Sequence, residues 1–128
     1  MGSRFLFVTF DCTDPRRVAE FWGEVLHYEV YAPNEAGGEV ELHDPAGAGP
    51  SLGFMKVPEG KVVNNRVHLD LTPDLPLEEE VTRLEGLGAT FVYTMEDPEG
   101  FENPMRWTML RDVEGNEFCV IEYFGDRR

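Results

Sequence analysis

The chain repeats one order of secondary-structure signals twice, with a period of about 60 residues. In each half a β-branched and aromatic segment comes first, an amphipathic helical segment follows, and three strand-like segments complete the unit. ELHDPAG at 41–47 aligns without gaps with MLRDVEG at 109–115, and both precede a final strand. One helix cannot cover both faces of a four-stranded sheet. Two βαβββ units are therefore expected to pack together and to leave a concave face for a ligand.

The expected elements follow from periodicity and from helix-capping and turn signals. In repeat one, about 4–57, they are a strand over 4–12, a helix opened by Asp14-Pro15 with an apolar stripe from Val18 to Leu26, and strands near 28–32, 38–43 and 51–57. In repeat two, about 65–124, they are a strand over 65–72, a helix opened by Asp74 and Pro76 and stopped at Gly88, and strands near 89–95, 105–111 and 117–124. Segment 58–64 is polar and rich in turn signals, so it is the expected linker. The fold class is therefore predicted to be α+β in a single domain spanning 1–128.

Composition excludes several functions. The chain has 128 residues, enough for one core, and 25 acidic against 11 basic side chains give a net charge of -14, which repels nucleic acid. An acidic surface favours solubility first and a cationic ligand second. Because no apolar run approaches membrane length and no secretory signal opens the chain, we expect a cytoplasmic protein with no membrane partner. Cys12 and Cys119 lie in strand-like segments without a CxxC motif, which excludes a disulfide scaffold. A free thiol in such a segment behaves as a small buried apolar group, and a reactive thiol is the alternative.

Several phrases agree in order and spacing with a known superfamily. They are DPRRVAEFW at the first helix, NRVHLDL at the start of the second unit, LGA after the second helix and RDVEGNEFCVIE at the end. With them the chain resembles the glyoxalase, bleomycin-resistance and extradiol dioxygenase superfamily, the vicinal oxygen chelate proteins, and within it the glyoxalase-like single-domain group. The resemblance implies an open half-barrel of mixed sheet with helices outside. It also implies a homodimer, for which exposed sheet edges give a physical reason.

The resemblance also implies two metal ligands in the second unit, His68 and Glu117, which would serve as the catalytic residues of an enzyme. Imidazole and carboxylate suit one divalent ion such as zinc, nickel, manganese or iron. The first unit departs from this pattern, because Thr9 and Ser51 fall at the corresponding positions and neither is a good ligand. Asp11 is the reserve candidate, since a shift of two residues keeps the same sheet face. The expected metal site is therefore incomplete.

The residues themselves leave further alternatives open. Alternation places His68 and Asp70 on one strand face, where a histidine beside a carboxylate could act as a general base without metal. Asp70 and Asp11 could bind a cationic ligand or pair with a nearby arginine. Asp44 and Asp112 precede glycines in both repeats, which favours a role in turns. The expected ligand-binding residues are Phe7, Thr9, Asp11, Met55, Asp70, Trp107 and Met109, and the apolar ones among them could instead belong to the core or to a dimer contact.

Two functions follow as hypotheses. The first is binding of a small organic molecule in the concave cavity, with sequestration as in bleomycin-resistance proteins. The second is a metal-dependent enzyme of the vicinal oxygen chelate type, a lyase, isomerase, epimerase or dioxygenase, that uses His68 and Glu117. A small molecule is the expected partner in both cases.

Overall fold

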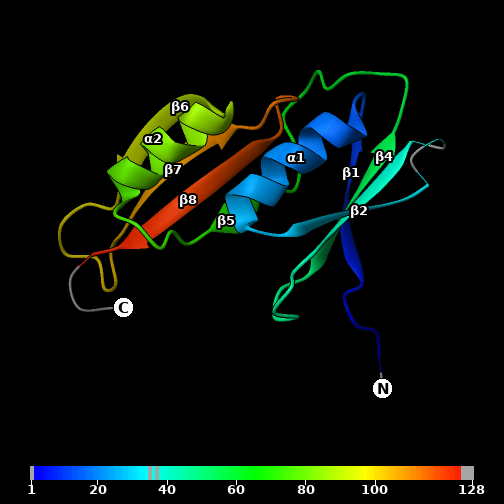
Figure 1. Ribbon diagram of the computed structural model, residues 1–128. Helices are drawn as coiled ribbons and strands as arrows, with labels where there is room; N and C mark the ends of the chain where they lie inside the picture. The colour runs from blue at the N-terminus through cyan, green and yellow to red at the C-terminus, as the bar shows by residue number, and fades with distance from the viewer. Residues whose placement is uncertain (1, 35, 37, 125–128) are drawn as a thin grey trace. The chain divides into compact units, whose positions relative to one another are not determined.

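The structure, a computed structural model, describes residues 2–34, 36 and 38–124. It divides into two compact units, Met1–Val62 (unit 1) and Val63–Arg128 (unit 2), and the boundary falls inside segment 58–64. Each unit is a four-stranded mixed sheet with one helix in the order βαβββ (Figure 1). The predicted α+β class and its two βαβββ repeats are therefore confirmed. That residues 1–128 form a single domain stays a prediction.

Unit 1 contains one helix and the first four strands. Its elements are β1 (Phe7–Cys12), α1 (Pro15–Leu26), β2 (Glu29–Asn34), β3 (Glu39–His43) and β4 (Ser51–Lys56). The sheet order is β1-β4-β3-β2, in which β1 and β4 are parallel and the other pairs antiparallel. As predicted, α1 begins at Asp14-Pro15: the Asp14 carboxylate accepts a hydrogen bond from the Arg17 N–H at 3.2 Å, and Pro15 is the first helical residue.

The core of unit 1 lies between α1 and one face of its sheet. The helix buries Val18, Ala19 and Trp22, while β3 and β4 contribute alternate residues such as Leu42 and Phe54. Because side chains alternate along a strand, Glu39, Glu41 and His43 then point away from α1. Each large apolar side chain buried here stabilises the fold by about 1.5–3 kcal/mol.

Unit 2 repeats this plan. Its elements are β5 (Leu69–Leu71), α2 (Leu77–Leu87), β6 (Thr90–Glu96), β7 (Met105–Arg111) and β8 (Glu117–Tyr123). The order is β5-β8-β7-β6, with β5 and β8 parallel. Its fully buried side chains include Leu84 of α2, Leu110 of β7 and Phe118 of β8. Within the described ranges, neither helix is long and apolar enough to cross a membrane.

The N-terminus of α2 differs from the expectation that Asp74 and Pro76 open the helix. The helix begins at Leu77, and Pro76 at the capping position offers no side-chain hydrogen bond. Instead, the Glu122 carboxylate on β8 accepts the Leu77 N–H at 3.1 Å. The cap therefore comes from a strand that follows 45 residues later. The other end is as predicted, since Gly88 adopts the left-handed conformation with φ of 117°.

The first strand of unit 2 is shorter than the predicted segment 65–72. Only Leu69–Leu71 pair with β8, and Val67 lies outside the strand with 79% of its surface exposed. The segment before β5 is held differently, because the Asn65 N–H donates to the Glu117 carboxylate at 3.0 Å. His68 consequently lies immediately before the strand.

Both predicted turn aspartates hold backbone N–H groups. Asp44 accepts from Ala46, Ala48 and Gly49 at 2.7–3.0 Å, and these hydrogen bonds lower the pKa of its carboxyl group. In unit 2 the buried Asp112 accepts from the N–H groups of Glu114 and Asn116. The repeated sequence pattern therefore produces the same kind of turn twice.

Candidate functional site

The candidate site of unit 2 is on the sheet face that points away from α2, here called the open face of unit 2. Glu122 reaches the first residue of α2, so alternation along β8 directs Cys119 to the opposite side. The parallel register pairs Asp70 with Cys119. The open face therefore contains side chains from β8 and from the segment around β5.

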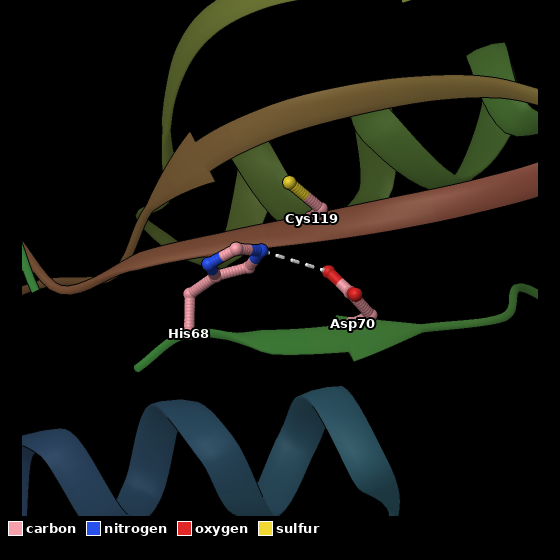
Figure 2. Close-up of side chains that lie close together, drawn as sticks. All are labelled: His68, Asp70 and Cys119. Atoms are coloured by element: carbon pink, nitrogen blue, oxygen red, sulfur yellow. Dashed lines mark ion pairs between the residues drawn. The ribbon is translucent and has the colours of Figure 1, made fainter. Parts of the chain in front are cut away.

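Three of these side chains converge: His68, Asp70 and Cys119. One potential ligand atom from each lies within 4.8 Å of the other two (Figure 2). The His68 Nε2 is 3.2 Å from the Asp70 Oδ1, and both side chains are about half exposed (43% and 53%). Cys119 is buried. The cluster thus combines an accessible imidazole and an accessible carboxylate with a buried thiol.

The thiol of Cys119 is not activated. Burial, and after it the negative charge of Asp70, raises the pKa of this thiol. A thiol with a raised pKa stays protonated near neutral pH and is a poor nucleophile. Direct attack on a substrate is therefore not the role that this environment favours, whereas a bound cation would favour the thiolate.

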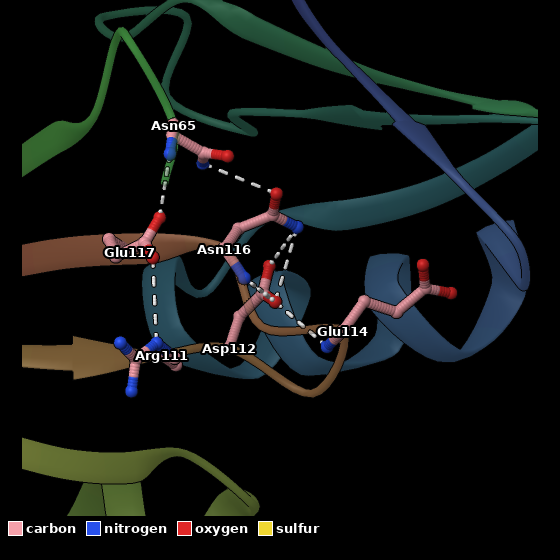
Figure 3. A network of polar contacts seen from close by, with 6 residues as sticks. All are labelled: Asn65, Arg111, Asp112, Glu114, Asn116 and Glu117. Atoms are coloured by element: carbon pink, nitrogen blue, oxygen red, sulfur yellow. Dashed lines mark hydrogen bonds and ion pairs between the residues drawn. The ribbon is translucent and has the colours of Figure 1, made fainter. Parts of the chain in front are cut away.

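Glu117 has different partners from His68. Its Oε1 accepts the Asn65 N–H at 3.0 Å, its Oε2 is 3.5 Å from the Arg111 Nε, and the residue is only 7% exposed (Figure 3). The Asn65 side chain also donates to the Asn116 side chain at 3.3 Å. These hydrogen bonds connect the segment before β5 to the start of β8. The joint metal role of His68 and Glu117 stays a prediction.

The sequence did not lead us to expect the convergence of Cys119 with His68: it indicated a small buried apolar side chain, with a reactive thiol as the alternative, and no place in the site. A signal was present, because Cys119 follows Glu117 by two residues and therefore shares its strand face. Whether His68 lies beside Glu117 or beside Cys119 depends on where β5 begins. The ends of a strand are the part that a sequence predicts least well.

The remaining predicted ligand residues fall on the two helix-free faces. Trp107 and Met109 on β7 are half-buried and pair with Ile121 and Cys119 of β8. In unit 1, the predicted residues share the face away from α1: Phe7, Thr9, Asp11 and Met55. Their roles in ligand binding stay predictions.

The two units differ in the metal ligands that they offer at corresponding positions. Imidazole, carboxylate and thiolate are all ligands of zinc and related first-row ions, so His68, Asp70 and Cys119 fit such an ion by their chemistry. In unit 1, Thr9 lies opposite Gly53, and the Ser51 hydroxyl is 3.3 Å from the His43 Nδ1. Neither hydroxyl is a strong ligand, as the sequence indicated.

Comparisons with known proteins agree with this architecture. A family model described as a glyoxalase-like domain matches residues 7–121, and the chain belongs to this family. With its solved relatives, this places the chain in the vicinal oxygen chelate superfamily. No curated protein sequence matches the chain.

Three solved structures illustrate the fold. A glyoxalase/bleomycin resistance protein/dioxygenase family enzyme from Burkholderia phytofirmans is 15% identical, with a TM-score of 0.73 over 95% of this chain and 100% of that chain. The fosfomycin resistance protein FosX from Listeria monocytogenes, a mutant in complex with Mn(II) and dihydroxypropylphosphonic acid, is 17% identical, with a TM-score of 0.71 over 94% and 90% of the two chains. A family member from Alicyclobacillus acidocaldarius is 17% identical, with a TM-score of 0.63 over 98% and 95%.

Proposed function

We propose that the chain binds a small organic molecule on the open face of unit 2, with His68, Asp70 and Cys119 as the polar centre of the site. The observation that carries this proposal is the convergence of their ligand atoms within 4.8 Å. Trp107 and Met109 add half-buried apolar surface on the same face. A few convergent polar groups beside apolar side chains are typical of small-molecule sites.

Sequestration without turnover is the form of this function that we favour. The raised pKa of the Cys119 thiol removes the strongest potential nucleophile of the cluster. In addition, Thr9 and Ser51 of unit 1 are poor ligands where the family resemblance implies metal binding.

The same cluster favours a second candidate function, that of a metal-dependent enzyme. The solved FosX with Mn(II) supports metal use within the superfamily. His68, Asp70 and Cys119 would hold a divalent ion, which would supply a Lewis acid for a developing oxyanion or enolate. The Asp70 carboxylate would also orient the His68 imidazole. Glu117 would join only by leaving Asn65 or Arg111, which hold its carboxylate now.

Metal uptake separates the two functions. Untagged protein is purified without chelator and dialysed against micromolar zinc, nickel or manganese, and its metal content is measured. For sequestration we expect no stoichiometric metal in the wild type. One ion per chain that is lost in the His68→Ala/Cys119→Ala variant would instead establish the metal-dependent function.

Single variants identify the ligands if metal is present. Loss of the ion in Cys119→Ala with retention in Glu117→Gln would support the three-residue cluster, and the reverse result would support the pair His68 and Glu117. Unit 1 offers control residues of the same types: Cys12→Ala removes the other buried thiol, and His27→Asn changes a histidine in a left-handed position that asparagine tolerates.

A further inference from the structure

The β2 and β3 edge of the unit 1 sheet borders a hollow, and three of its four lining residues point away from α1. It is lined by Glu29, Val30, Tyr31 and His43 at the β2 and β3 edge of the sheet, and its volume is about 370 Å³. This volume is in the range of small-ligand sites. No residue of the cluster in unit 2 takes part in it.

The imidazole of His43 is held at both nitrogens. The Glu41 Oε1 is 3.0 Å from Nε2, and the Ser51 hydroxyl is 3.3 Å from Nδ1. Because an ionised carboxylate only accepts, the neutral imidazole carries its hydrogen on Nε2, and Nδ1 accepts from the Ser51 hydroxyl. Both nitrogens are thereby engaged, so the ring is available to a ligand as a fixed aromatic surface.

Two further aromatic rings surround this imidazole. Phe7 and Tyr31 meet it in edge-on arrangements, with ring centroids 6.3 Å and 5.9 Å away. Tyr31 nevertheless remains 57% exposed. An exposed aromatic ring beside a hollow is a binding surface for cations, which are attracted to the negative ring face.

The charge of this face has a single sign. Alternation and register direct Asp11, Glu29, Glu39 and Glu41 to the side away from α1. Lys56 is the only basic residue of the four strands, and it follows the buried Phe54 by two residues and therefore shares the α1 side. Nothing basic in these strands offsets the carboxylates next to the aromatic hollow.

We propose that the hollow lined by Glu29, Tyr31 and His43 is a second ligand site, which binds organic ammonium cations with an apolar body. The rings contact the apolar body and the cationic group, and the Glu29 and Glu41 carboxylates select for positive charge. This site goes beyond the function proposed for unit 2, and it does not depend on that function.

Titration with phenyltrimethylammonium, followed by NMR, tests the site. We expect saturable shifts of the His43 and Tyr31 ring signals, a dissociation constant on the order of millimolar and weaker binding at high salt. Benzenesulfonate, which carries the same ring with a negative charge, is expected not to bind.

Substitutions locate the binding energy. Tyr31→Leu and Glu29→Gln should each raise the dissociation constant about fivefold. The control for Tyr31→Leu is Phe101→Leu, which removes an aromatic ring of similar exposure from a loop of unit 2. The control for Glu29→Gln is Glu20→Gln, which removes an exposed carboxylate from α1. Both control variants should bind as the wild type does. Thermal melts confirm that each variant is folded.

Three results would overturn the proposal. The first is the absence of saturable shifts at His43 and Tyr31. The second is equal binding of benzenesulfonate. The third is unchanged affinity in folded Tyr31→Leu and Glu29→Gln.

Discussion

Unit 1 and unit 2 have the same sheet order, but they complete their helices by different means. The cap of α1 is local, because Asp14 accepts from an N–H three residues later. The cap of α2 is tertiary, because Glu122 reaches Leu77 from β8 and also pairs with Arg106 at 2.8 Å. Duplicated topology therefore does not require duplicated local signals: a contact from a distant strand can replace a missing capping residue.

The helix-free faces of the two sheets differ in charge. In unit 2 the Glu117 carboxylate lies beside Arg111, and Asp70 lies beside His68. In unit 1 the corresponding face has carboxylates and aromatic rings, and none of the described strand residues that point to this face is an arginine or lysine. The two faces therefore differ in the groups that they present: a cluster of imidazole, carboxylate and thiol in unit 2, and carboxylates around aromatic rings in unit 1.

The largest expected effects concern the two cores. Phe54→Ala in unit 1 and Phe118→Ala in unit 2 each remove a fully buried ring, so each should lower the free energy of unfolding by about 3–5 kcal/mol. Urea titrations measure this loss. Tryptophan fluorescence follows each unit separately: Trp22 reports on unit 1 when Trp107 is changed to phenylalanine, and Trp107 reports on unit 2 when Trp22 is changed to phenylalanine.

The same titrations test whether the units are energetically one domain. As the predicted single domain requires, either core substitution should move both tryptophan transitions together. A transition that moves in the substituted unit alone would show instead that the two units unfold independently.

The turn aspartates should differ in cost although their sequence pattern is the same. Asp112 is buried and accepts hydrogen bonds from the N–H groups of Glu114 and Asn116, so Asp112→Ala should lower the unfolding free energy by about 2–4 kcal/mol. Asp44→Ala leaves N–H groups that are more accessible to water, so the free energy of unfolding should fall by less than in Asp112→Ala. Equal losses by chemical denaturation would contradict the burial argument.

The helix caps should show the next difference. Glu122→Ala removes the α2 cap and leaves the partly buried Arg106 without its 2.8 Å partner, which should cost about 2 kcal/mol. Asp14→Ala removes only a local cap and should cost about 1 kcal/mol. Thermal and urea unfolding measure both, and Glu20→Ala on the exposed side of α1 is the control. A larger loss of unfolding free energy in Asp14→Ala than in Glu122→Ala would contradict this prediction.

The smallest effect concerns pH. Hydrogen bonds from Ala46, Gly49 and Ala48 lower the pKa of Asp44 below its value in the unfolded chain. Its stabilisation is therefore fully present above the unfolded pKa, near 4, and is lost as the pH falls through the lower folded value. The difference in melting temperature between wild type and Asp44→Asn should shrink from about pH 6 to about pH 3. A difference that stays constant over this range would exclude the titration of Asp44 as its cause.

The sequence predicted what depends on local and periodic signals. The βαβββ repeats, the Asp14-Pro15 start of α1 and the Gly88 stop of α2 follow from residues adjacent in the chain. The cap from Glu122 could not be predicted, because it requires a contact across 45 residues. The partners of His68 depend in the same way on where β5 begins and on its register with β8. Strand pairing, rather than residue type, decided the composition of the candidate site.

The parallel pairing of first and last strands has a consequence for the order of folding during synthesis. Phe7 of β1 faces Ser51 of β4, so the parallel pair of unit 1 forms only after nearly the whole unit has left the ribosome. Unit 1 then has all its strand partners while unit 2 is still being made. In unit 2, both the pairing of β5 with β8 and the cap of α2 wait for the last strand. Because such distant contacts form slowly, the exposed interval before β8 arrives is when unit 2 is most open to misassembly.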